Sequence, residues 1–236
     1  MPRDKIELLL LHALPLDGSM WKGQMGLLPG ATHAPTLYAM GNRMENWAAA
    51  ALELVKGDRV IVAGCSVGGS CALEVAMMAP HRVAALVLVG TKAVHRPDIA
   101  LHASALEVID QQGLEKAWET FWFPLFSRTT ADSITAHAKG MALRQAPEDI
   151  ARGVTVFHTR PSRDQILREA PFPIVFVTGA DDVAPGPKTT SAQAKMAQQG
   201  QMHIIPNCGH YVPLERAEVL NEILRDTIAK SGNARF

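Results

Sequence analysis

The sequence predicts an α/β protein with a mostly parallel sheet of about six strands flanked by helices. Short runs rich in Val, Ile and Leu, such as 59–64 and 83–90, alternate with longer segments of helical period. Strands that recur between helices in this way form βαβ units, in which the strands are parallel. The composition is that of a globular domain, because 47% of the 236 residues are hydrophobic and 19% are charged.

The elements follow from these patterns in chain order. Strands are expected at residues 5–12, 33–38, 59–64, 83–90, 173–178 and 201–206. Helices are expected at residues 20–28, 44–56, 67–79, 188–199 and 213–229. The alternation stops after Lys92 and resumes after Pro171. We therefore predict an α/β core from 1–92 and 171–236, with a helical cap inserted at 93–170.

Charge and cysteine content exclude several classes of function. Lys and Arg number 23, as do Asp and Glu, so no net charge attracts nucleic acid or an anionic membrane. Three cysteines without a C-x-x-C pair argue against a disulfide framework and a zinc site, and they favour the cytoplasm. The apolar stretch 6–11 is too short to span a membrane. The sequence carries no signal for the oligomeric state.

The predicted cap contains a cluster of aromatic residues. The segment 118–126 holds five of the thirteen Phe, Tyr and Trp residues. Trp118, Trp122 and Phe123 are therefore candidates to line an apolar substrate pocket. The alternative is that they form a small core within the cap, since large aromatic side chains dominate most cores.

The motif Gly64-Cys65-Ser66-Val67-Gly68 joins a predicted strand directly to a predicted helix. A serine in this G-x-S-x-G pattern occupies a sharp, strained turn that exposes its hydroxyl above the sheet. The N-terminus of the following helix favours negative charge that develops beside the serine. We predict that Ser66 is a nucleophile.

A serine hydroxyl needs a base to accept its proton. His210 follows the last predicted strand, in the sequence Asn207-Cys208-Gly209-His210, and is the expected base. The base in turn needs a carboxylate, and Asp181 and Asp182 both follow the strand at 173–178. His12 ends the first strand and is expected to be a buried histidine that anchors its loop.

Attack on a carbonyl creates an oxyanion, which rigid backbone N–H groups stabilise. The N–H of Val67, directly after the nucleophile, is one expected donor. The N–H of Leu14, in the loop after the first strand, is the other.

These motifs resemble the α/β-hydrolase superfamily, and within it the capped esterase and lactonase group that includes 3-oxoadipate enol-lactonases and pimeloyl-carrier esterases. The resemblance covers nearly the whole chain except the cap. The catalytic aspartate of this superfamily usually stands three residues after the glycine of its loop, which selects Asp182. The resemblance also implies that the leading β-hairpin is missing. Two features depart from the superfamily pattern, since Ala13 replaces the glycine of the first loop and the loop at 38–44 has no G-x-G-x-S turn.

The combined pattern predicts a serine hydrolase that cleaves a small carboxylic ester, lactone or thioester through an acyl-enzyme on Ser66. No metal or organic cofactor is expected. One alternative is carbon–carbon bond hydrolysis or a lyase reaction with the same triad, and another is a ligand-binding receptor on a hydrolase scaffold. Arg43, Lys92 and Arg96 are candidates to bind a substrate carboxylate, although such residues are usually solvated.

Overall fold

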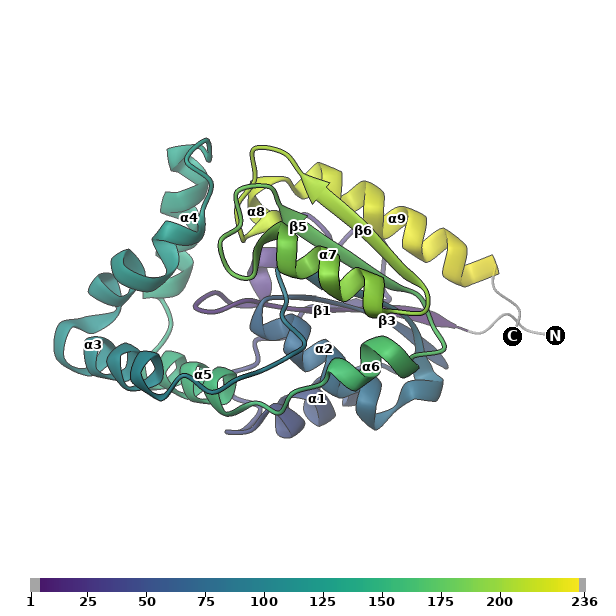
Figure 1. Cartoon of the computed structure of the whole chain (residues 1–236), viewed down its shortest axis with the longest axis horizontal. Coiled ribbons are helices and arrows are strands. Elements are labelled where there is room, and N and C mark those ends of the chain that lie inside the picture. The colour runs from purple at the N-terminus through teal and green to yellow at the C-terminus, as the bar shows by residue number, and fades with distance from the viewer. Residues whose placement is uncertain (1–4, 234–236) are drawn as a thin grey trace.

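The computed structural model describes residues 5–233 and contains one six-stranded sheet (Figure 1). The strand order is β2-β1-β3-β4-β5-β6, and every neighbouring pair is parallel. The predicted α/β class is therefore confirmed. The strands are β1 (Ile6–Leu11), β2 (Thr32–His33), β3 (Arg59–Cys65), β4 (Val83–Val89), β5 (Ile174–Gly179) and β6 (Gly200–Ile205).

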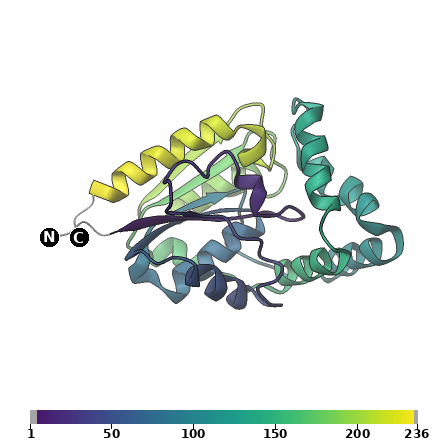
Figure 2. The ribbon, with the colours of Figure 1, turned by 180° about the vertical axis from the view of Figure 1, so that it is seen from behind.

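Helices cover both faces of the sheet. Seen from opposite sides, α7 lies in front of the sheet in Figure 1, whereas α9 and the short helix η1 lie in front in Figure 2. Because both faces are covered, β4 and β5 are buried at every position and can be continuously apolar. The α-helices are α1 (Met44–Glu53), α2 (Val67–Met78), α3 (Ile99–Ala117), α4 (Asp132–Leu143), α5 (Pro147–Thr159), α6 (Asp164–Glu169), α7 (Gly186–Met196), α8 (Val212–Glu215) and α9 (Ala217–Asn233). The shorter turns are η1 (Gly18–Trp21), η2 (Pro80–Arg82), η3 (Trp118–Trp122) and η4 (Phe123–Leu125).

Three predicted elements differ most from the structure in extent, whereas the other boundaries agree to within about three residues. The strand expected at 33–38 ends at His33, because Pro35 cannot donate a ladder hydrogen bond. The helix expected at 20–28 is reduced to η1 and isolated turns, consistent with the low helix propensity of Gly23 and Gly26. The helix expected at 213–229 is divided into α8 and α9 at Arg216, whose φ is −142°.

The segment between β4 and β5 is helical, and its parts lie in two places. Helices α3, α4 and α5, here called the cap helices, extend from one end of the molecule (Figure 1). Helix α6 instead packs beside α2 and α7. The segment thus returns to the core through α6 before β5 begins. The division into a core and a cap at 93–170 stays a prediction.

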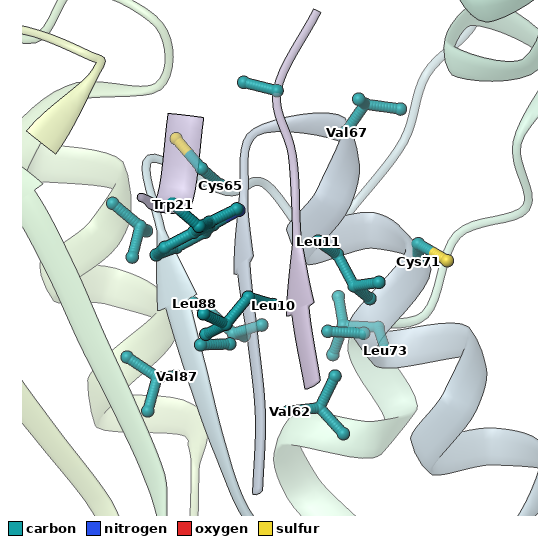
Figure 3. Packing of buried hydrophobic residues seen from close by; sticks show 14 of the residues in the cluster. Leu10, Leu11, Trp21, Val62, Cys65, Val67, Cys71, Leu73, Val87 and Leu88 are labelled. Carbon is teal, nitrogen blue, oxygen red and sulfur yellow. The ribbon is translucent and has the colours of Figure 1, made fainter. Parts of the chain in front are cut away.

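The core beneath the carboxyl ends of the strands is densely apolar. Figure 3 shows Leu10 and Trp21 of η1 on one face of the sheet, and Leu11, Val62 and Leu73 of α2 on the other. Burying each such side chain contributes about 1.5–3 kcal/mol relative to exposure. This packing holds the ends of β1, β3 and β4 in one rigid edge.

Two further features bear on the class of protein. No helix within residues 5–233 combines the length and apolar character that a membrane span requires. Cys65, Cys71 and Cys208 are buried free thiols. Burial raises the pKa of all three thiols well above the ordinary value, so they are protonated at neutral pH.

Candidate active site

Ser66 occupies the single residue between β3 and α2. Its backbone angles are φ 56° and ψ −117°, a conformation that non-glycine residues rarely adopt and that typically costs about 1–3 kcal/mol. Hydrogen bonds on both sides hold it there, because its N–H donates to the carbonyl of Val89 and its carbonyl accepts from the N–H of Gly69. The strained serine predicted from the motif is present.

Gly64 and Gly68 make this turn possible. A Cβ on Gly64 would lie 2.2 Å from the carbonyl oxygen of Gly68, and a Cβ on Gly68 would lie 2.1 Å from that of Leu11. Neither position tolerates a side chain without backbone movement. The close approach of Gly68 to Leu11 and His12 also sets the start of α2 against the loop that follows β1.

His210 and Asp182 form a buried pair at the same edge of the sheet. His210 lies in the loop after β6 and Asp182 in the loop after β5, and Nδ1 of the imidazole lies 3.1 Å from Oδ1 of the carboxylate. Their exposed fractions are only 3% and 4%. An ionised carboxylate can only accept, so Nδ1 carries the proton and Nε2 is left as the basic nitrogen.

The surroundings of Asp182 favour its charged form. Burial acts to raise the pKa of this carboxyl, but hydrogen bonds from His210, the Ala184 N–H and the Thr178 hydroxyl outweigh it and hold the pKa below the ordinary value. Asp181 has a different partner, since its carboxylate accepts a 2.6 Å hydrogen bond from the Ser127 hydroxyl. The structure therefore brings Asp182, and not its neighbour, to the histidine.

The loop that carries His210 is organised around the buried carboxylate of Glu215. This carboxylate accepts hydrogen bonds from the backbone N–H groups of Ser127, Gly209 and Tyr211, at 2.9–3.0 Å, and from the hydroxyl of Thr130. Glu215 thus ties the residues on both sides of the histidine to the segment that follows the aromatic cluster at 118–126.

The two expected oxyanion donors follow neighbouring strands of the sheet, Leu14 after β1 and Val67 after β3. Val67 is the first residue of α2, and Leu14 lies in the loop after β1, where the Tyr211 hydroxyl donates to its carbonyl at 3.0 Å. Among the residues that the structure describes, neither the N–H of Leu14 nor that of Val67 has a hydrogen-bond acceptor. That these two N–H groups bind an oxyanion stays a prediction.

His12 is fully buried beside this loop. Its Nε2 accepts from the N–H of Leu37 at 2.9 Å, and its Nδ1 lies 3.1 Å from the carbonyl of Ala13. The ring is therefore neutral and has one fixed tautomer. Burial lowers the pKa of His12 from 6.5 to about 4.

The buried His12 predicts a loss of stability in mild acid. An unfolded chain protonates this histidine near pH 6.5, whereas the folded protein does so only near pH 4. The stabilisation is thus complete above pH 6.5 and is lost as the pH falls toward 4. We expect the free energy of unfolding to be about 2 kcal/mol lower at pH 5.0 than at pH 7.5 from this residue alone.

Urea unfolding at the two pH values measures this effect. The difference should shrink in His12→Gln and persist in His137→Gln, where the histidine is exposed. An equal pH dependence in the two variants would contradict the assignment to His12.

A cavity of about 320 Å³ opens beside the nucleophile. Ser66 and Lys92 line it from the core, and Phe157 and Arg160 line it from the end of α5. The remaining lining residues are Ser70, Gly90, Val183, Ala184, Pro185 and Thr189. Within residues 5–233, no cluster of three or more His, Cys, Asp or Glu side chains could hold a metal ion.

The three aromatic residues predicted to bind substrate do not line this cavity. Trp118 and Trp122 are buried, whereas Phe123 is half exposed. Trp118 packs against Phe126, which in turn lies 4.6 Å from the ring of Tyr211. Packing of this kind agrees with the alternative that the cluster forms a core, one that also supports the histidine loop.

Sequence reasoning missed two residues of this site, Arg160 and Glu215. Arg160 directly precedes Pro161 where α5 ends, and a helix end before a proline was a local signal for a residue at the return to the core. Glu215 is close to the histidine in sequence, but no local pattern marks a glutamate as buried.

Comparison with known proteins agrees with this geometry. Residues 8–223 match the sequence model of the alpha/beta hydrolase family. The chain belongs to the α/β-hydrolase family.

Three relatives illustrate the range of activities near this hydrolase. It is 36% identical over 104 residues to the pimeloyl-[acyl-carrier protein] methyl ester esterase of Aromatoleum aromaticum, a match that covers 40% of this chain and only 41% of that protein. It is 24% identical over 209 residues to the 2-hydroxy-6-oxo-2,4-heptadienoate hydrolase of Pseudomonas putida, covering 79% and 70% of the two chains. Among solved structures, a thermophilic esterase from Thermogutta terrifontis with malate bound superimposes with a TM-score of 0.86 at 25% identity, covering 98% and 92%. These relatives support hydrolase activity.

Proposed function

We propose that this α/β hydrolase cleaves a small carboxylic ester, lactone or thioester through an acyl-enzyme on Ser66. One observation carries the proposal. A strained serine lines a cavity at the sheet edge to which the buried His210–Asp182 pair also belongs. Serine nucleophiles in other hydrolases are activated by the same combination of base and carboxylate.

The reaction follows from the roles of these groups. Nε2 of His210 accepts the hydroxyl proton as Oγ of Ser66 attacks the carbonyl carbon. The N–H groups of Val67 and Leu14 stabilise the tetrahedral oxyanion. His210 then protonates the leaving alcohol or thiol, and an acyl-enzyme forms. A water molecule, deprotonated by the same nitrogen, releases the acid and restores the serine. No step requires a metal or an organic cofactor.

A second candidate is hydrolysis of a carbon–carbon bond with the same triad. The match to the Pseudomonas putida heptadienoate hydrolase over 79% of this chain favours it. This candidate predicts that the protein hydrolyses a 2-hydroxy-6-oxodienoate. The decrease in the visible absorbance of this substrate measures the reaction. Ester turnover without decay of the dienoate would exclude it.

Fluorophosphonate labelling and ester turnover test the primary proposal. The unaltered protein should be labelled at Ser66 and should hydrolyse members of a p-nitrophenyl ester series from acetate to octanoate. Label and turnover should both disappear in Ser66→Ala, and turnover should fall in His210→Ala. Ser70→Ala is the matched labelling control, because Ser70 lies in α2, which begins directly after Ser66, and lines the same cavity. Absence of labelling and of turnover in the unaltered protein would favour a ligand-binding role.

A further inference from the structure

Arg160 is a buried cation in the cavity that contains Ser66. It lies directly after α5, and only 6% of its surface is exposed. Its guanidinium donates to the carbonyl of Phe157 and stacks on that residue's ring, with Cζ 3.9 Å from the ring centre. Within the part of the chain that the structure describes, no carboxylate pairs with Arg160.

A buried guanidinium without an anion is unfavourable, because burial removes hydration that an ion pair would replace. Burial lowers the pKa of Arg160 to about 10, so the side chain is still charged at neutral pH. Arg163, three residues later, has the carboxylate partner that a partly buried arginine usually has. Its guanidinium contacts both carboxylate oxygens of Glu74, at 2.7 and 3.1 Å. Arg160 therefore has an unmet requirement for an anion.

The cavity itself selects the kind of anion. Its ionisable lining residues are Lys92 and Arg160, both positive, and its other walls include the apolar side chains of Phe157, Val183 and Pro185. The volume of about 320 Å³ lies at the lower end of the range for small-molecule sites, about 300–1,000 Å³. These features suit a small acid with a short apolar chain. The planar guanidinium also matches a carboxylate through two parallel hydrogen bonds.

We propose that the substrate is a small ester or lactone that carries a free carboxylate, and that Arg160 binds this carboxylate while Ser66 attacks the scissile carbonyl. The inference rests on the proposed function for its catalytic part. Arg160 is thereby the residue that determines specificity, and Lys92 adds to the positive field at the mouth of the site.

Kinetics with matched charged and neutral esters test the proposal. Monomethyl glutarate carries the charge on the acyl side and O-acetylglycolate on the alcohol side, and the primary amide of each is the neutral control. The protein should prefer at least one acid to its amide. Arg160→Gln should lower kcat/KM for that acid about 100-fold and for its amide less than about threefold. Arg160→Lys should be intermediate. Arg225→Gln, at an exposed arginine of α9 outside the cavity, should match the unaltered protein.

Binding of glutarate to the Ser66→Ala protein, measured by calorimetry, tests recognition without turnover. Binding that disappears in Ser66→Ala/Arg160→Gln supports the carboxylate site even where no ester is hydrolysed, and that result would refute only the proposed function. Ester turnover without preference for either acid, together with no glutarate binding, would refute the carboxylate site alone. Tighter binding of inorganic phosphate than of glutarate would also overturn it. If Arg160→Gln does not fold, as judged by circular dichroism, Arg160→Lys is used in both measurements.

Discussion

Replacing Asp182 with asparagine is expected to lower kcat for ester hydrolysis about 10⁴-fold. The carboxylate accepts from Nδ1 of His210 and so keeps Nε2 free to act as the base. Asparagine has nearly the same shape, but its amide N–H₂ can face Nδ1 and favour the opposite tautomer. Nε2 would then carry the proton and could not accept one from Ser66. The negative charge that stabilises the imidazolium would also be lost.

Asp181→Asn is the matched control for this prediction. It makes the same chemical change one residue away, at a carboxylate that accepts from Ser127 instead of the histidine. We expect its kcat to change less than about tenfold, since only the support of the loop is altered. Steady-state kinetics with one p-nitrophenyl ester measure both variants, and thermal melting shows that both are folded. Equal losses in the two variants would be incompatible with Asp182 as the acid of the triad.

Replacing Glu215 with alanine is expected to destabilise the protein by about 4 kcal/mol or more. The substitution would leave three backbone N–H groups and the Thr130 hydroxyl without their buried acceptor. Each buried donor that loses its partner typically costs about 1–3 kcal/mol. Because domains have total stabilities of about 5–15 kcal/mol, this change alone could prevent folding at elevated temperature.

Urea unfolding monitored by circular dichroism measures this effect. Glu218→Ala is the control, because Glu218 is an exposed glutamate at the start of α9. It should change the free energy of unfolding by less than about 0.5 kcal/mol. Glu215→Gln should fall between the two, since its amide keeps one acceptor oxygen. A Glu215→Ala protein as stable as the Glu218→Ala protein would show that the loop does not depend on this carboxylate.

Much of the fold could be predicted from local patterns. A parallel strand buried on both faces must be continuously apolar, and this identified β3, β4 and β5 within about one residue at each end. The serine turn was equally readable, because its glycines lie two residues on either side of Ser66 and have no room for a Cβ. The two adjacent aspartates were not separable by composition or position, and it was the resemblance to the superfamily that favoured Asp182.

Where a proline interrupts the hydrophobic pattern, the sequence predicted more regular secondary structure than the chain forms. Apolar content suggested a strand through Tyr38, but Pro35 ended it after two residues. Tyr38 is nevertheless buried, with its hydroxyl donating to the carbonyl of Leu16. Hydrophobicity therefore located a buried residue correctly while assigning it to the wrong kind of backbone.

The sequence by itself determined the class of the sheet, the strained serine and the order of the candidate nucleophile, acid and base. Each depends on residues that are neighbours in the chain. The periodicity of hydrophobic residues and the steric requirement of a tight turn can therefore be recognised in a short stretch of sequence. Only the tertiary structure decided the composition of the cavity and the support of the histidine loop. Arg160 is brought to Ser66 across 94 positions of sequence, and Glu215 reaches Ser127 across 88. Such contacts depend on the path by which the segment between β4 and β5 returns to the core. Whether one charged side chain is buried depends on the residues that pack around it, and most of these are distant in the sequence.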